Sequence, residues 1–225
     1  MRKDYIENMA GVERRFITTR VEKVKVEERN DEKQGSLIRG IAVKVNSEAD
    51  LGWFREIIMP GALDKVLADT NKLDCRCLFN HDANLILARA NKNTDTLKLM
   101  LNADGDLEFE YETPNRTYAL DLADSIASGD VSQCSFAFRI AKEGQRWIFD
   151  EENPNNDLRE ITEISELLDV SPVTYPAYPD TQVGERSHKA ARSENPRYSK
   201  NKSRAVLRKA QFKFNKNKAN CLWTL

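Results

Sequence analysis

Two short stretches of this 225-residue sequence hold the residue types that nucleophilic catalysis needs. In Phe79–Asp82, His81 follows an apolar, strand-like run, and Val131–Ile140 contains Ser135. The chain has only two histidines, so chemistry that depends on an imidazole has few positions available. A histidine within hydrogen-bonding distance can take the proton of a serine hydroxyl and make it a nucleophile. A structural histidine and a packed serine would give the same residues, so their types alone leave the chemistry open.

The residues around Ser135 alternate between apolar and other types, which predicts a β-strand. One face of this strand would be largely aromatic and the other would hold small or charged side chains. We therefore expect Ser135 to be an exposed nucleophile on a rigid strand whose opposite face packs in a core. The apolar face would consist of Cys134, Phe136, Phe138 and Ile140, and the other face of Ser135, Ala137 and Arg139.

A histidine base also needs a third group that fixes its tautomer and stabilises the charge it gains. The segment after the serine strand supplies four acids, which are Glu160, Glu163, Glu166 and Asp169. In a regular strand Glu163 and Asp169 would share one face and Glu166 would lie on the other, although a bulge would change this. The parity of the strand therefore leaves more than one acid open.

Two other chemistries deserve comparison with the serine mechanism. Cys134 is adjacent to Ser135, so on a strand it points to the aromatic face, where a buried thiol acts as a small apolar side chain. Cys75 and Cys77 precede His81, but structural zinc sites usually combine closely spaced cysteines with a distant second pair, which this sequence lacks. We therefore expect neither a metal nor an organic cofactor.

The elements that would position these residues are mostly short strands. Two helices are expected, one after Pro60-Gly61 and one over Arg116–Ser128, which Gly129 would end. Two hairpins are expected, one of Phe16–Val26 with Leu37–Val45 and one around Asp104-Gly105. Many short strands with two helices predict an α+β, mainly β domain or a β-barrel. Further strands are expected at 53–60, 73–79, 85–89, 97–101, 107–111, 131–140 and 161–173.

The charge distribution divides the chain. From Lys189 onward there are 11 Lys and Arg and 1 Asp or Glu, a charge of +10. The preceding residues keep 24 basic and 35 acidic side chains, a charge of −11. We expect a flexible start over residues 1–12, a folded domain over 13–181 and a basic, disordered tail over 182–225, in which His188 is solvated. No apolar run approaches the ~20 residues of a membrane span, so we expect no membrane partner.

Several of these motifs occur in one family, in the same order. The sequence resembles the HK97-type prohead (capsid maturation) serine proteases of tailed phages, which are related in fold to the herpesvirus assembly proteases. The resemblance implies an assemblin-like β-barrel with flanking helices. The segments that match are VERRF (Val12–Phe16), LIRGIAVKVNSEADLGWFREIIMPGALDKVL (Leu37–Leu67), FNHDANLILAR (Phe79–Arg89), GDVSQCSFAFRI (Gly129–Ile140) and ISELLDVSPVTYPAYPDT (Ile164–Thr181).

The resemblance implies a role for each site residue. His81 in the family's NHD motif would be the general base, and Ser135 in its MSFGF-like motif would be the nucleophile. The family usually has Glu where this chain has Asp169, so we favour Asp169 as the orienting acid, then Glu166, with Glu163 still open. Ala137 stands where the family usually has Gly, and it could affect an oxyanion hole built from the neighbouring backbone N–H groups.

The resemblance also implies a function. It predicts a serine endopeptidase that works inside the phage procapsid in the host cytoplasm, cleaves scaffold or the scaffold-like segment of the major capsid protein, and often processes itself. A homodimer is left open. Two alternatives remain: a catalytically inactive capsid-assembly or scaffold-like module, and a nucleic-acid-binding protein that uses the basic tail. The acidic body and the absence of a recognition motif argue against nucleic acid as the partner.

Overall fold

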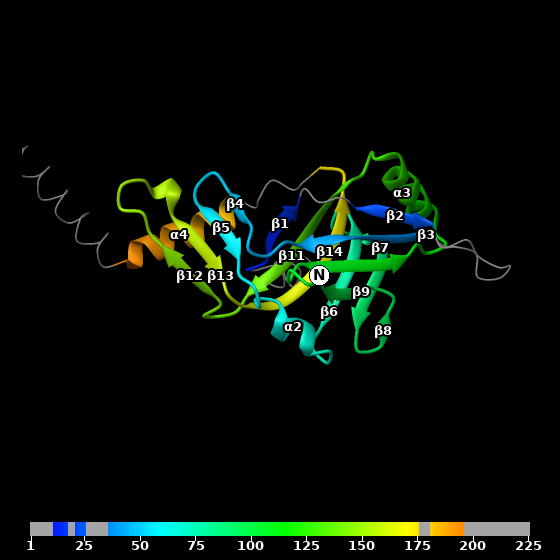
Figure 1. Ribbon diagram of the computed structural model, residues 1–225, viewed down its shortest axis with the longest axis horizontal. Helices are drawn as coiled ribbons and strands as arrows, with labels where there is room; N and C mark the ends of the chain where they lie inside the picture. The colour runs from blue at the N-terminus through cyan, green and yellow to red at the C-terminus, as the bar shows by residue number, and fades with distance from the viewer. Residues whose placement is uncertain (1–10, 18–20, 26–35, 176–180, 196–225) are drawn as a thin grey trace, which may run out of the picture. The chain divides into compact units, whose positions relative to one another are not determined.

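The computed structural model describes residues 11–17, 21–25, 36–175 and 181–195 (Figure 1). Strands outnumber helices in these residues, which confirms the expected mainly β, α+β class. The strands form three sheets, each with two free edges in its strand order. The closed barrel that the resemblance implies therefore stays a prediction. In the described part of the chain, no helix is long and apolar enough to cross a membrane.

The largest sheet has six strands and carries the residues singled out above. Its order is β1-β11-β14-β6-β7-β8, so β11 lies between β1 and β14, and β14 lies between β11 and β6. All neighbours are antiparallel except β14 and β6, which are parallel. The strands are β1 (Glu13–Ile17), β6 (Asp74–Phe79), β7 (Asp82–Asn91), β8 (Thr94–Asp95), β11 (Gln133–Ile140) and β14 (Ile164–Val173).

Two four-stranded sheets complete the β structure. The second sheet has the order β2-β3-β10-β9 and contains both expected hairpin pairings, β2 with β3 and β9 with β10. The third has the order β12-β13-β5-β4. The strands of the second are β2 (Glu22–Lys25), β3 (Ser36–Val43), β9 (Lys98–Leu101) and β10 (Leu107–Glu112). Those of the third are β4 (Glu48–Asp50), β5 (Arg55–Ile58), β12 (Gln145–Ile148) and β13 (Leu158–Ile161).

The start of the chain differs from the expectation of one strand over Phe16–Val26. Residues 13–17 form β1, which pairs with β11 in the six-stranded sheet, whereas β2 pairs with β3 in the second sheet. The chain therefore changes sheets between Ile17 and Glu22. The irregular alternation of this stretch is consistent with two short strands that belong to different sheets.

The helices are α2 (Asp64–Ala68), α3 (Thr117–Ser128), α4 (Thr181–Glu194) and the 3₁₀ turn η1 (Pro154–Asn156). The helix α3 ends as expected at Gly129, whose φ of 88° is left-handed. The expectation of disorder is wrong for residues 182–194, which form most of α4. His188, which was expected to be solvated, lies in this helix one turn before Arg192. The rest of the expected tail, like residues 1–10, lies outside the described residues.

The core packs around β11, whose aromatic face is buried as expected. Phe136 and Phe138 are almost fully buried, with their ring centroids 5.1 Å apart. The opposite face of β11 is buried as well, because Ser135 and Ala137 are 0% and 1% exposed. The expectation of an exposed Ser135 is therefore wrong. The pattern of alternation identified the two faces, but it could not show that other elements cover both.

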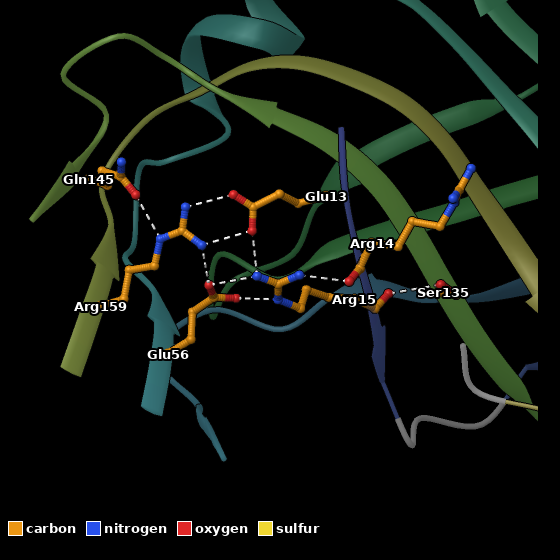
Figure 2. Close-up of polar contacts among 7 residues, drawn as sticks. All are labelled: Glu13, Arg14, Arg15, Glu56, Ser135, Gln145 and Arg159. Atoms are coloured by element: carbon orange, nitrogen blue, oxygen red, sulfur yellow. Dashed lines mark hydrogen bonds and ion pairs between the residues drawn. The ribbon is translucent and has the colours of Figure 1, made fainter. Parts of the chain in front are cut away.

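A cluster of four buried charges joins the six-stranded sheet to the third sheet (Figure 2). Arg15 on β1 donates to both carboxylate oxygens of Glu56 on β5, at 2.5 and 2.9 Å, and to Glu13 at 2.6 Å. Arg159 on β13 donates to Glu13 at 2.6 and 2.8 Å and to Glu56 at 3.1 Å. The charges balance, and each acid contacts both arginines. The cluster therefore holds β1 against β5 and β13.

The cluster shifts the titration of its own members. Burial alone would raise the pKa of Glu13, but hydrogen bonds and charges from Arg159 and Arg15 outweigh burial and lower this pKa below its ordinary value. A carboxylate with a lowered pKa stabilises the fold above its unfolded-state pKa, and this contribution is lost as the pH falls through the folded-state pKa. The cluster should therefore weaken only in acid.

We expect Glu56→Gln to destabilise the fold strongly. The substitution leaves the buried cations Arg15 and Arg159 with a single acid, and breaking a buried ion pair in this way costs about 3–5 kcal/mol. Urea unfolding would measure the loss. The control is Lys65→Gln, which breaks the exposed pair with Glu163 and should cost no more than ~1 kcal/mol. Equal losses in the two variants would contradict a structural role for the cluster.

Candidate active site

Ser135 lies in the middle of β11, between two antiparallel neighbours. Its Cα is opposite Phe16 on β1 and opposite Ser171 on β14. Residues opposite each other in a ladder have side chains on the same face, so Ser135 and Ser171 point to one side of the sheet. The same register puts Ala137 opposite Asp169. The sheet therefore brings a serine and a carboxylate to one face from adjacent strands.

His81 occupies a tight turn between β6 and β7. Phe79 at the end of β6 pairs with Asp82 at the start of β7, so the loop has only two residues. Both loop residues have left-handed backbones, with φ of 54° at Asn80 and 58° at His81. Two-residue hairpin loops favour positive φ at both positions, where Asn is common and Gly usually follows. A histidine in the second position is strained, and such strain often marks functional sites.

The side chain of Asn80 fixes this turn to the end of β14. Its Oδ1 accepts hydrogen bonds from the backbone N–H and the hydroxyl of Thr174, each at 2.9 Å. The backbone N–H of Asn80 donates a hydrogen bond to the carbonyl of Pro172 at 3.0 Å. Because β6 runs parallel to β14, these bonds place His81 above the strand that carries Asp169. Sequence reasoning assigned no role to Asn80, although an Asn before the histidine at a strand end is itself a turn signal.

The side chains of Asp169, His81 and Ser135 form a continuous chain of contacts. The Nδ1 atom of His81 lies 2.6 Å from Oδ1 of Asp169, and its Nε2 atom lies 2.7 Å from Oγ of Ser135. The side chains of His81 and Asp169 are 10% and 9% exposed, so the contacts are shielded from water. With a proton on Nδ1, Nε2 is free to accept the hydroxyl proton of Ser135. This arrangement suits transfer of a proton from serine to histidine.

The other acids in this segment have different partners. Glu166 forms a short ion pair with Arg139 on β11, and its side chain is 55% exposed. Glu163 binds Lys65 at 2.6 Å, and Glu160 accepts a hydrogen bond from Arg146 at 2.6 Å. The register of β14 against β11 shifts twice, on either side of Glu166. The alternation of faces therefore cannot be counted from Glu163 through to Asp169. Among the four acids considered, Asp169 is the one that contacts His81.

Ser171 is a polar residue of the site that sequence reasoning missed. It is fully buried, and its hydroxyl donates to Oδ1 of Asp169 at 2.7 Å. The same oxygen receives the contact from His81, so Ser171 and His81 hold one carboxylate oxygen from two sides. The spacing of two residues between Asp169 and Ser171 puts both on one face of β14 and was visible in the sequence.

The hydroxyl of Ser135 has a second partner on its other side. Its Oγ lies 3.0 Å from the backbone carbonyl oxygen of Arg15 on β1, which accepts a hydrogen bond from it (Figure 2). A serine hydroxyl has one proton, so it can donate to Arg15 or to His81 but not fully to both. The carbonyl of Arg15 therefore competes with the imidazole for the proton of Ser135.

The cysteine and metal readings can be compared with the structure directly. Cys134 is fully buried, and burial raises the pKa of its thiol to about 12, so it stays protonated at neutral pH. Burial also raises the pKa values of Cys75 and Cys77 well above their ordinary range. Within the described ranges, no group of three or more His, Cys, Asp or Glu residues could hold a metal ion. The serine is therefore the better candidate nucleophile.

Three comparisons with known proteins bear on the family of this chain. The family model described as caudovirus prohead serine protease matches residues 22–195. Among solved structures, the bacteriophage T4 capsid assembly protease is similar with 13% sequence identity and a TM-score of 0.44, over 72% of this chain and 99% of that one. A search of curated proteins gave no match.

We expect the turn at Asn80 to be sensitive to the residue type. Asn80→Ala removes two hydrogen bonds to Thr174 and puts a residue that disfavours positive φ in a left-handed position, so it should lower the free energy of unfolding by about 1–3 kcal/mol. Asn80→Gly loses the same side-chain bonds but tolerates the backbone and should cost less. Urea unfolding of both variants would measure the difference. A larger loss for Asn80→Gly would contradict the role of the backbone conformation.

Proposed function

Because the chain belongs to the caudovirus prohead serine protease family, we propose that it is a serine endopeptidase in which Ser135 is the nucleophile, His81 the general base and Asp169 the orienting acid. The observation that carries the proposal is the unbroken chain of contacts from Asp169 through the imidazole to Oγ of Ser135. Its order is the one that acyl transfer by a serine requires.

The chemistry follows from these contacts. His81 takes the proton of Ser135 through Nε2 while Oγ attacks the carbonyl carbon of a peptide bond. The imidazolium then gives this proton to the leaving amine, and the peptide's acyl group stays on Oγ as an ester. A water molecule, deprotonated by the same nitrogen, hydrolyses the ester and restores Ser135. Asp169 accepts a hydrogen bond from Nδ1–H of His81 throughout, and its negative charge stabilises the imidazolium.

Ser171 supports this machinery as a positioning residue. Asp169 is nearly buried, so its carboxylate depends on hydrogen bonds from protein groups rather than from water. The hydroxyl of Ser171 supplies one of these bonds to the oxygen that also faces His81. It therefore keeps this oxygen aligned with Nδ1 and limits rotation of the carboxylate, so the imidazole stays aimed at Ser135.

The family suggests where the enzyme acts and on what. We propose that its substrates are phage capsid-assembly proteins, either scaffold or the scaffold-like segment of the major capsid protein, and the chain itself. It would work inside the procapsid in the host cytoplasm. The basic residues from Lys189 onward would then hold the acidic body to acidic scaffold or shell surfaces, and such contacts should weaken as salt screens them.

We expect Ser135→Ala to abolish cleavage. The variant lacks the nucleophile, so kcat/KM for capsid-protein cleavage should fall by roughly 10⁴-fold or more. Mass spectrometry after coexpression with the capsid protein would give both the extent and the sites of cleavage. The control is the adjacent Cys134→Ala, which should lose some packing stability but keep its cleavage sites. Normal processing by a folded Ser135→Ala protein would exclude the serine mechanism.

We also expect the residues around His81 to act in a graded order. Asp169→Asn should lower kcat by about 10³- to 10⁴-fold with KM little changed, because the wrong imidazole tautomer is favoured. Glu166→Gln should be close to wild type, because Glu166 pairs with Arg139 at the surface. Steady-state kinetics on a peptide taken from a mapped cleavage site would measure both.

Ser171→Ala should lower kcat by less than Asp169→Asn and by more than Glu166→Gln. It should lower kcat by roughly tenfold at unchanged KM, since the carboxylate keeps its charge but loses one aligned bond. The matched control is Ser165→Ala on the same strand, whose exposed hydroxyl donates to the carbonyl of Arg139 and should not affect kcat. A purely structural role for Ser171 would appear as lower stability with normal kcat, and the proton resonance of His81 Nδ1–H would then be unchanged.

A further inference from the structure

The nucleophile of the proposed protease is inaccessible in this arrangement. Ser135 is 0% exposed, yet its Oγ must reach the carbonyl carbon of a peptide bond. One neighbour of β11 is β14, which is itself paired with β6 inside the sheet. The other neighbour is β1, a five-residue strand at the edge of the sheet. Of the two strands beside Ser135, β1 is the one that can leave without breaking the sheet.

The strand β1 lies along the edge of β11 beside Ser135, where an added peptide strand would lie. It is extended and antiparallel to β11, with Phe16 opposite Ser135. This pairing brings the carbonyl oxygen of Arg15 to 3.0 Å from Oγ (Figure 2). An extended peptide that added to the same edge of β11 would bring its own carbonyls to the same place, as in other cases of recognition by strand addition.

We propose that β1 is a pseudosubstrate: it occupies the edge of β11 along which an extended peptide substrate binds, and it must leave this edge before Ser135 can react. The inference rests on the proposed serine mechanism. While β1 is bound, the carbonyl of Arg15 covers Oγ and competes with His81 for the hydroxyl proton. Release of β1 opens the edge to the peptide and leaves His81 as the acceptor of that proton.

The buried charge cluster suits a strand that has a bound and a released state. Its four members divide into two ion pairs, Glu13 with Arg15 on β1 and Glu56 with Arg159 on the third sheet. If β1 leaves, each acid can stay paired with the arginine of its own sheet, so no buried charge is left without a partner. The penalty that makes most broken buried ion pairs so costly is thereby reduced. The cluster holds β1 in place but does not make its release prohibitive.

A native cysteine offers a way to lock β1 in place. The register puts Ile17 of β1 opposite Cys134 of β11, and paired residues in an antiparallel ladder have Cα atoms about 4.5–5.5 Å apart, within the range that a disulfide spans. Ile17→Cys in the full chain, with Cys75→Ala, Cys77→Ala and Cys221→Ser so that Cys134 is the only other thiol, should therefore form a disulfide when it is refolded in a glutathione redox buffer. Failure of the two thiols to cross-link would contradict the register itself.

The probe is diisopropyl fluorophosphate, which reacts with an activated serine by forming an Oγ–P bond as the P–F bond breaks and HF is released. Mass spectrometry would follow labelling of Ser135 over time. We expect the oxidised, locked protein to be labelled roughly tenfold or more slowly than the same protein after reduction, because the rate scales with the fraction of open molecules. The control is Ile17→Cys with Cys134→Ala, which cannot form this lock and should not respond to oxidation.

A second variant tests the opposite direction. Deletion of residues 1–17 should accelerate labelling and cleavage of a peptide substrate, provided that circular dichroism shows a folded protein; if it does not fold, the disulfide experiment decides. Equal labelling of the locked and reduced proteins would overturn the pseudosubstrate role. A folded deletion variant that is labelled more slowly would instead make β1 part of the catalytic machinery. No labelling of Ser135 in the reduced, full-length protein would reject the serine mechanism itself.

Discussion

The pairing of β11 with β14 is the constraint on which the site depends. One register sets Ser135 opposite Ser171 and Ala137 opposite Asp169, so the nucleophile, the acid and the hydroxyl that supports the acid share one face. A shift of β14 by one residue would turn both Asp169 and Ser171 to the other face of the sheet, away from Ser135. The two register irregularities of β14 lie toward its start, away from Ser171. The catalytic end of the ladder is therefore regular, and the irregular end accommodates the surface ion pair of Glu166 with Arg139.

Local patterns in the sequence predicted local structure well. The alternation around Ser135 identified β11 and its aromatic face, and Gly129 correctly ended α3. Long-range pairing was less accessible, because it depends on residues that are distant in the chain. Nothing near Glu13 indicated that β1 would cover Ser135, so the exposure of the serine was predicted wrongly. For the same reason the contact of Asp169 with His81 rested on a family resemblance and not on spacing.

Buried charged residues were a second feature that the sequence did not reveal. Arg15 and Arg159 lie in the interior, where they are 6% and 1% exposed, and both meet Glu13 and Glu56 there (Figure 2). Such residues are buried only when partners of opposite charge come from other strands, and a sequence does not show those partners. The acidic body thus includes charges that contribute to the core and not to the surface field.

The turn at His81 makes fold stability and chemistry compete for one position. A left-handed backbone at the second residue of a two-residue hairpin is most easily adopted by glycine, and a side chain there costs about 1–2 kcal/mol of conformational energy. The imidazole at that point contacts both Asp169 and Ser135. Contacts elsewhere in the fold must therefore offset the cost of the left-handed backbone conformation of His81. The backbone conformation of the two-residue turn sets the direction of the His81 side chain. A longer or shorter hairpin loop would therefore move the imidazole away from Asp169 and Ser135.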